Sequence, residues 1–178
     1  MMAGEGTRPT YEGFGSVGGV PSPRCILSCA LAACYTICAN TNLLFHACTA
    51  ARRPLLGNIH AFDCLSEIWK KSAALNGWFV GRFILMPDHV HFFASPSSGA
   101  KNRSDWTKLW KSVSARQLAK EFNVNPPFWQ VDTFDHILRS AESYSEKWNY
   151  VQANPVRRGL VGRAENWRWQ GELHSLAF

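Results

Sequence analysis

Two apolar runs separated by a single Pro-Asp step occupy the middle of the chain. Residues 78–86 (WFVGRFILM) are rich in aromatic and branched side chains, and residues 89–95 (HVHFFAS) resume an extended pattern after Pro87. Because proline cannot donate to a strand ladder, it fits between strands better than inside one. The pattern therefore predicts two strands joined by a tight connection.

Three helical segments accompany this pair of strands. Between residues 55 and 69 apolar side chains recur at steps of three and four residues, as one buried helical stripe requires, until Asn76-Gly77 supplies a stop. A second helix is predicted over residues 104–122, with Ser104 as its N-cap. A third is predicted over residues 140–153, because Pro155 disfavours helical geometry at the residue before it.

The two ends of the chain are less regular than its middle. Residues 1–24 contain six glycines and three prolines, which predicts a flexible leader. Residues 26–41 predict a first strand, and residues 128–139 a loop with a short extended piece. Since 178 residues is near the usual size of one domain, we expect a single domain over residues 25–178.

All six cysteines lie within the first 64 residues, and none has the CxxC spacing that zinc ribbons favour. This pattern is typical of small buried hydrophobic residues in a reducing compartment, so a cytoplasmic location is expected. The longest apolar stretch, residues 25–39, has 15 residues, whereas a membrane-spanning helix needs about 20. No membrane segment is predicted.

Two pairs of residues could carry chemistry. His89 and His91 are two apart in a predicted strand, so both imidazoles point to one face and could hold a divalent ion, with Asp88 as a further ligand or as a hydrogen-bond acceptor. Tyr150 and Asn154 are four apart at a helix end and share one face. Taken alone, each pair is more often a feature of ordinary core or surface packing than of a functional site.

Basic residues are concentrated in one segment. Residues 101–120 contain six basic residues against one acidic residue, a net charge of +5 out of the +6 of the whole chain. This excess indicates a polyanionic partner such as nucleic acid, although a solvated helix face has the same composition. Arginines interleave with tryptophans in residues 157–169, a mixture suited to phosphate contact and base stacking.

Three stretches together resemble a known family. They are GWFVGRFILMPDHVHFFASP at residues 77–96, FWQVDTFDHILRSAESY at 128–144 and KWNYVQANPVRRGLV at 147–161. In content, order and separation they resemble the REP-associated tyrosine transposases, a branch of the single-tyrosine HUH transposases. The resemblance implies an α+β fold: a ferredoxin-like antiparallel sheet with helices packed on one face.

The same resemblance implies a site and a reaction. His89, His91 and Asn154 would hold Mg²⁺ or Mn²⁺, and Tyr150 would attack a single-stranded DNA hairpin to give a covalent 5′-phosphotyrosine. Tyr144, about 600° of helical rotation from Tyr150, is the poorer nucleophile. Whether the protein acts as a monomer or a homodimer stays open. The residues expected to contact DNA phosphates are Lys101, Arg103, Lys108, Lys111, Arg116, Arg157 and Arg158. The tryptophans that could stack on bases are Trp106, Trp110, Trp129, Trp167 and Trp169.

Two other functions are compatible with the sequence. The chain could keep the fold and bind DNA without cleaving it. It could also be a structural or redox metal protein with Cys25, Cys29, Cys34 and Cys38 as ligands, although a strand in this region would scatter these side chains.

Overall fold

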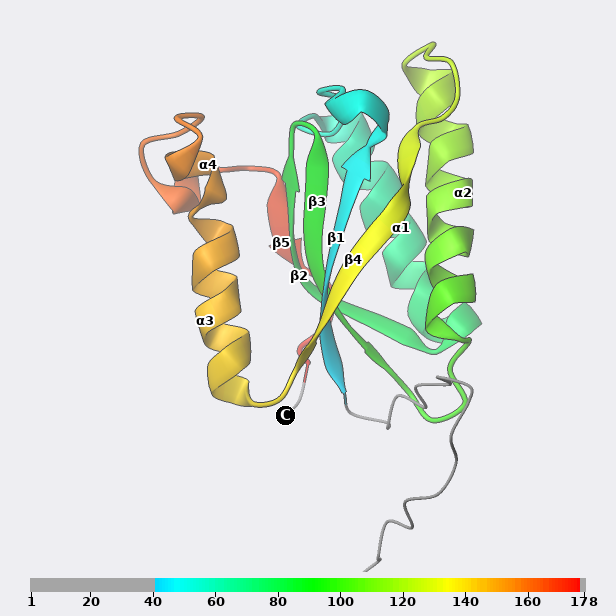
Figure 1. Cartoon of the computed structure of the whole chain (residues 1–178), viewed down its shortest axis with the longest axis vertical. Coiled ribbons are helices and arrows are strands. Elements are labelled where there is room, and N and C mark those ends of the chain that lie inside the picture. Colours follow the sequence, from blue (N-terminus) through cyan, green and yellow to red (C-terminus); the bar gives the residue numbers. More distant parts are fainter. Residues whose placement is uncertain (1–40, 177–178) are drawn as a thin grey trace, which may run out of the picture. The chain divides into compact units, whose positions relative to one another are not determined.

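The structure is a computed structural model that describes residues 41–176. Five strands form one antiparallel sheet in the order β4-β1-β3-β2-β5 (Figure 1). The strands are β1 (Asn42–Thr49), β2 (Trp78–Met86), β3 (His89–Pro96), β4 (Trp129–Leu138) and β5 (Gln170–Glu172). The α-helices are α1 (Ile59–Asn76), α2 (Arg103–Glu121), α3 (Ala141–Gln152) and α4 (Asn154–Arg157), and two 3-10 turns are η1 (Ala50–Arg52) and η2 (Ala164–Asn166). The expected α+β class with an antiparallel sheet is confirmed.

The central hairpin lies where the sequence predicts it. β2 and β3 pair from Trp78 opposite Pro96 to Met86 opposite His89, with one register shift between Val80 and Phe83. β3 is also paired on its other edge with β1, so its backbone is bonded on both sides. The histidines of β3 therefore belong to a strand in the middle of the sheet.

The outer strands correct two expectations. The first described strand is β1, and most of the run expected as a strand, residues 26–41, lies outside the described residues, as do the leader and Cys25 to Cys38. Residues 128–139 are not mainly a loop, because β4 pairs with β1 over most of that span. β4 has few buried side chains because it lies at the sheet edge, so its apolar pattern is weak.

One face of the sheet packs against α1 and α2. Its core includes Trp69 of α1 and Trp106 and Trp110 of α2, all at most 1% exposed, packed on Phe92 of β3. Trp129 and Trp167 are also buried, at 6% and 9% exposure. The expectation that these tryptophans stack on bases is wrong for Trp106, Trp110, Trp129 and Trp167, because their rings fill the protein core.

The opposite face packs against α3. Tyr144, Trp148 and Val151 follow each other at helical spacing and lie on a second apolar cluster that includes Phe93 of β3. The expectation of helices on a single face therefore holds for α1 and α2, whereas α3 covers the other side (Figure 1). Tyr144 is 8% exposed and belongs to the core, as expected of a residue off the face of Tyr150.

Side chains and glycine set the helix ends. The Asn58 side chain accepts a hydrogen bond from the Ala61 amide at the start of α1, and Ser140 does the same for α3 with Ser143. α2 begins one residue earlier than expected. Its N-cap is Asn102, whose side chain accepts from the Ser104 amide, so Ser104 is not the cap.

Gly77 ends α1 in the left-handed conformation, with φ at 71°, and its environment leaves no room for a methyl group. A Cβ there would lie 2.9 Å from Ala100 Cα. We expect Gly77→Ala to lower the free energy of unfolding by about 1–3 kcal/mol. The matched control is Gly99→Ala, with φ at 79° and no atom of residues 41–176 within 4 Å of the added Cβ. If urea unfolding finds both variants equally destabilised, the steric clash with Ala100 does not explain the loss of stability in Gly77→Ala.

Among residues 41–176, none of the helices combines the length and the apolar character that a membrane crossing needs.

Candidate active site

Three imidazoles converge on the face of the sheet that carries α3. On β3, Val90 and Phe92 pack into the α1/α2 core, so His89 and His91 point to the other side. On β1, Phe45 and Ala47 also pack into the α1/α2 core, so His46 between them points to the same face as His89 and His91. His46 lies directly opposite His91 in the sheet register, and one ring nitrogen of each of the three histidines lies within 4.8 Å of the others.

The rings of this cluster, defined as His46, His89 and His91, contact one another closely. His46 stacks on His91 with ring centroids 4.5 Å apart and 14° between the planes, and His89 stands edge-on to both. His46 was not expected from the sequence. Its strand was not predicted, and only the β1–β3 pairing brings it opposite the histidine pair.

The environment keeps these imidazoles neutral. Burial is the main cause that lowers the pKa of His91 to about 3, and the neighbouring His46 and His89 add to it, followed by the positive charges of Arg52 and Arg157. Burial, then His89 and Arg52, lowers the pKa of His46 to about 4. Burial also lowers the pKa of His89 and outweighs the opposing effect of Asp88. Neutral imidazole is the form that binds metal ions.

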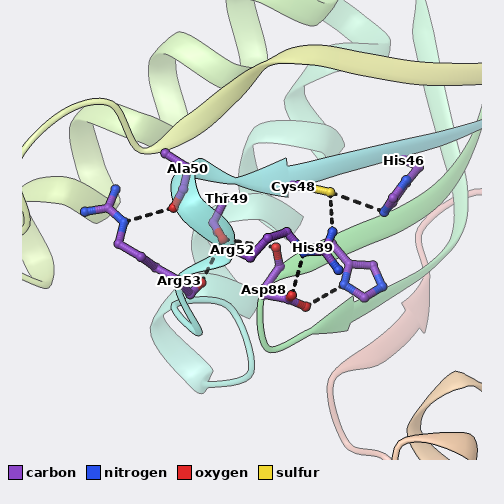
Figure 2. Close-up of polar contacts among 8 residues, drawn as sticks. All are labelled: His46, Cys48, Thr49, Ala50, Arg52, Arg53, Asp88 and His89. Carbon is purple, nitrogen blue, oxygen red and sulfur yellow. Dashed lines mark hydrogen bonds and ion pairs between the residues drawn. The ribbon is translucent and has the colours of Figure 1, made fainter.

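Asp88 fixes the orientation of His89 (Figure 2). Its carboxylate lies 2.6 Å from His89 Nδ1 and 2.8 Å from Arg52 Nε. Because His89 is neutral at pH 7, its Nδ1–H donates to Asp88, which leaves Nε2 free with its lone pair. Burial alone would raise the pKa of Asp88, but the hydrogen bond from His89 and the positive charges of Arg52 and Arg158 lower it instead. The carboxylate therefore stays ionised.

Arg52 also links this group to β1. Its Nη1 lies 2.6 Å from Cys48 Sγ, which is 3.5 Å from His46 Nε2 (Figure 2). Arg52 and the preceding Ala51 both adopt positive φ angles, 56° and 54°, which side chains other than glycine rarely tolerate. Thr49 holds the segment in place, since its Oγ1 donates to the carbonyls of Arg53 and Asp88. This strained turn is what brings the guanidinium to Asp88.

The side chain of Arg157 contacts both Tyr150 and Asn154. Arg157 Nη2 donates to Asn154 Oδ1 at 2.5 Å and to the Tyr150 carbonyl at 2.6 Å, and its guanidinium carbon lies 4.0 Å from the centre of the Tyr150 ring. Tyr150 is 61% exposed, in contrast to the buried Tyr144. Tyr150 and Asn154 therefore lie where α3 ends and α4 begins, and the Tyr150 side chain is accessible to solvent.

The register of α3 on β3 relates this helix end to the histidines. The rings of Phe93 and Tyr144 are 4.5 Å apart between centroids. From Phe93, His91 lies two residues back along β3, about 7 Å away. From Tyr144, Tyr150 lies six residues further along α3, about 9 Å away. Because β3 and α3 run in opposite directions, both steps lead toward the same end of the sheet (Figure 1).

The basic residues expected to bind DNA divide into two groups. Arg157 and Arg158 are exposed on or just after α4, and their charges act on His91 and His89 respectively. The others, Lys101, Arg103, Lys108, Lys111 and Arg116, lie on or before α2, which packs on the face opposite the histidines. The sheet therefore separates the second group from the histidine cluster.

Two members of the α2 group already have partners in the protein. Lys111 Nζ donates to the carbonyls of Gln130, Val131 and Asp132 and to Thr133 Oγ1, which ties α2 to β4. Arg103 pairs with Asp135 at 2.5 Å. Lys101, Lys108 and Arg116 are exposed.

The histidine cluster suits a divalent metal ion. Metal–imidazole bonds of about 2.0–2.1 Å place ligand nitrogens roughly 3–4 Å apart, so nitrogens within 4.8 Å need only small side-chain rotations. His91 Nδ1 is buried, and among residues 41–176 it has no hydrogen-bond partner. A buried ring nitrogen without a partner carries a desolvation cost that a metal ion or a water molecule would remove.

Comparisons with known proteins agree with the expectations drawn from the sequence motifs. The family model described as "Transposase IS200 like" matches residues 39–153. A Haemophilus influenzae protein provisionally named a REP-associated tyrosine transposase is 27% identical over 92 residues, covering 47% of this chain and 52% of its own. The REP-associated tyrosine transposase of Escherichia coli is 23% identical over 93 residues, covering 52% of this chain and 50% of its own. The chain spans about half the length of these curated relatives.

A solved structure shares the fold. It is a REP-associated tyrosine transposase bound to a REP hairpin, with a TM-score of 0.60 and 18% sequence identity, covering 74% of this chain and 76% of the other.

Proposed function

Because this chain belongs to the IS200-like transposase family, we propose that it cleaves and rejoins single-stranded DNA beside a folded hairpin, with Tyr150 as the nucleophile. The expected kinship with REP-associated tyrosine transposases is confirmed by the curated relatives, and a solved structure of such a transposase has the same fold. The related solved protein is bound to a REP hairpin, which supports a hairpin as the DNA form to test first.

The observation that carries this proposal is the placement of Tyr150. Helix α3, which carries Tyr150, packs on the face of the sheet that holds the histidine cluster, and its Tyr150 end points toward the same end of the sheet. Tyr150 and His91 are nevertheless 59 residues apart in the chain. An exposed tyrosine on the helix that covers a cluster of neutral imidazoles suits attack on a phosphodiester.

The proposed reaction exchanges one phosphate ester for another. The Tyr150 hydroxyl loses its proton and its oxygen bonds to phosphorus, while the bond from phosphorus to the 3′-oxygen breaks. The products are a 5′-phosphotyrosine and a strand that ends in a free 3′-hydroxyl, which takes up a proton. Reversal with another 3′-hydroxyl rejoins DNA, so no nucleotide cofactor is consumed.

The other residues of the site bind and orient. His89 and His91 would hold a divalent metal ion, for which the family resemblance implies Mg²⁺ or Mn²⁺ with Asn154 as a third ligand. Such an ion, when bound, would polarise the scissile phosphate. Asp88 keeps His89 turned so that Nε2 faces away from the carboxylate. Arg157 and Arg158 would contact phosphates near the site. The α2 residues would contact only DNA that extends around the β4 edge.

Covalent capture tests the proposal. The full chain is incubated with hairpin oligonucleotides labelled at the 3′ end, since the 3′ fragment stays on the tyrosine, and the products are separated under denaturing conditions. We expect a protein–DNA adduct in Mn²⁺, its loss in EDTA and its return when Mn²⁺ is added back. Hairpin binding, measured by anisotropy, should persist in EDTA. Binding without any adduct would identify a non-cleaving DNA-binding protein instead.

A further inference from the structure

His46 has the position of a metal ligand, although it belongs neither to the His89–His91 pair nor to α3, which carries Tyr150. It faces His91 across the β1–β3 pairing, and its nitrogen belongs to the group within 4.8 Å. Its ring stacks on that of His91, so the two imidazoles are already side by side. Among residues 41–176, the one polar contact of its ring is with the Cys48 sulfur at 3.5 Å, a weak partner that a metal ion can replace.

Asn154, the third ligand expected from the sequence, is engaged elsewhere. Its Oδ1 accepts from Arg157 Nη2 at 2.5 Å, and the same guanidinium covers the Tyr150 ring. An amide oxygen held by a permanent positive charge is a poor ligand for a second cation until that arginine moves away. The imidazole of His46 has no such competitor.

We propose that His46, His89 and His91 form a three-histidine site, with His46 as the third ligand, and that this site selects a first-row transition metal over Mg²⁺. The inference rests on the metal-dependent part of the proposed function and changes both the ligand set and the ion. Mg²⁺ prefers oxygen ligands and gives up its water reluctantly. Imidazole nitrogen favours later transition metals, and affinity at such a site rises from Mn²⁺ to Co²⁺.

The position of the three histidines supports a preformed site. β3 is bonded on both edges, and β1 is paired with β3 on one side and β4 on the other. The backbone under all three ligands is therefore held by the sheet, and Asp88 orients one ring. Binding needs only side-chain rotation, which limits its entropic cost.

Calorimetric titration of the full chain without DNA tests this ligand set, with Co²⁺, Mn²⁺ and Mg²⁺ as probes. We expect one Co²⁺ per chain, at least tenfold weaker Mn²⁺ binding, and weaker Mg²⁺ binding still. His46→Phe keeps an aromatic ring to stack on His91 but has no nitrogen, so it should weaken Co²⁺ binding at least tenfold and change the visible absorption of the bound ion. Asn154→Ala should change Co²⁺ affinity less than twofold.

Two controls separate metal ligation from folding. His60→Phe removes an exposed imidazole on α1 and should bind Co²⁺ as the unmodified chain does. Melting in EDTA checks that each variant folds, and His46→Gln replaces His46→Phe if the latter does not. Wild-type Co²⁺ affinity in the His46 variant, or an equal loss in Asn154→Ala, would overturn the proposal. Because no DNA is present, that result is distinct from failure of strand cleavage, which the adduct reports.

Discussion

Tyr150→Phe is expected to form no covalent adduct with hairpin DNA while still binding it. The substitution removes the only atom of this side chain that can attack phosphorus, so adduct formation should fall by at least about a thousandfold. The ring that lies against Arg157 is kept, and a side chain that is 61% exposed contributes little to the core. Folding and DNA affinity should therefore change little.

Tyr144→Phe is the matched control for this experiment. Tyr144 lies on the same helix but packs on Phe93 at 8% exposure, so its hydroxyl is remote from incoming DNA. This variant should form the adduct. If instead Tyr150→Phe is captured as efficiently as the unmodified chain, the nucleophile is a different residue and the proposed reaction has to be reassigned.

In EDTA, the chain is expected to lose stability steadily as the pH falls from about 6.5 toward 4. The folded-state pKa is about 3 for His91 and about 4 for His46, against 6.5 for exposed imidazole. Below pH 6.5 the unfolded chain therefore takes up protons that the folded chain does not, which favours unfolding. Above pH 6.5 both states are neutral at these groups, and the effect disappears.

The size of this effect can be isolated with one substitution. His91 contributes at most about 1.4 kcal/mol per pH unit, and His46 contributes less because its partial exposure screens it. Urea unfolding of His91→Asn at pH 7.5, 6 and 5 should give a shallower decline than the unmodified chain, whatever its absolute stability. Identical slopes for the two proteins would show that His91 is not the group that resists protonation.

The elements with strong local signals were predictable from the sequence. The β2–β3 hairpin was predictable because two aromatic runs flank a proline. Helix α1 was predictable because its apolar stripe ends at a glycine, which adopts positive φ in the structure. β4 was missed since an edge strand buries few side chains, and Val131 on it is 96% exposed. The N-cap of α2 lies two residues before the expected Ser104, because Asn102 and Ser104 are both good caps.

The site was predictable only in part. His89 and His91 could be recognised as a pair because side chains two residues apart in a strand point to the same face. His46 could not be found in this way, because its partnership depends on the register between β1 and β3, a long-range pairing with no local signal. The tryptophans show the converse problem. Residue type suggested base stacking, whereas the depth of Trp106 and Trp110 in the core depends on helix packing.

The bond between Arg157 and the Tyr150–Asn154 pair has a consequence for the order of events on DNA. One guanidinium covers the phenol ring and holds the amide beside it, and the same group attracts phosphate. A backbone phosphate that draws Arg157 toward itself thereby releases the tyrosine side chain to swing. If Tyr150 is the nucleophile proposed above, the arrival of a strand and the release of the phenol would be one event, so cleavage would wait until DNA is in place.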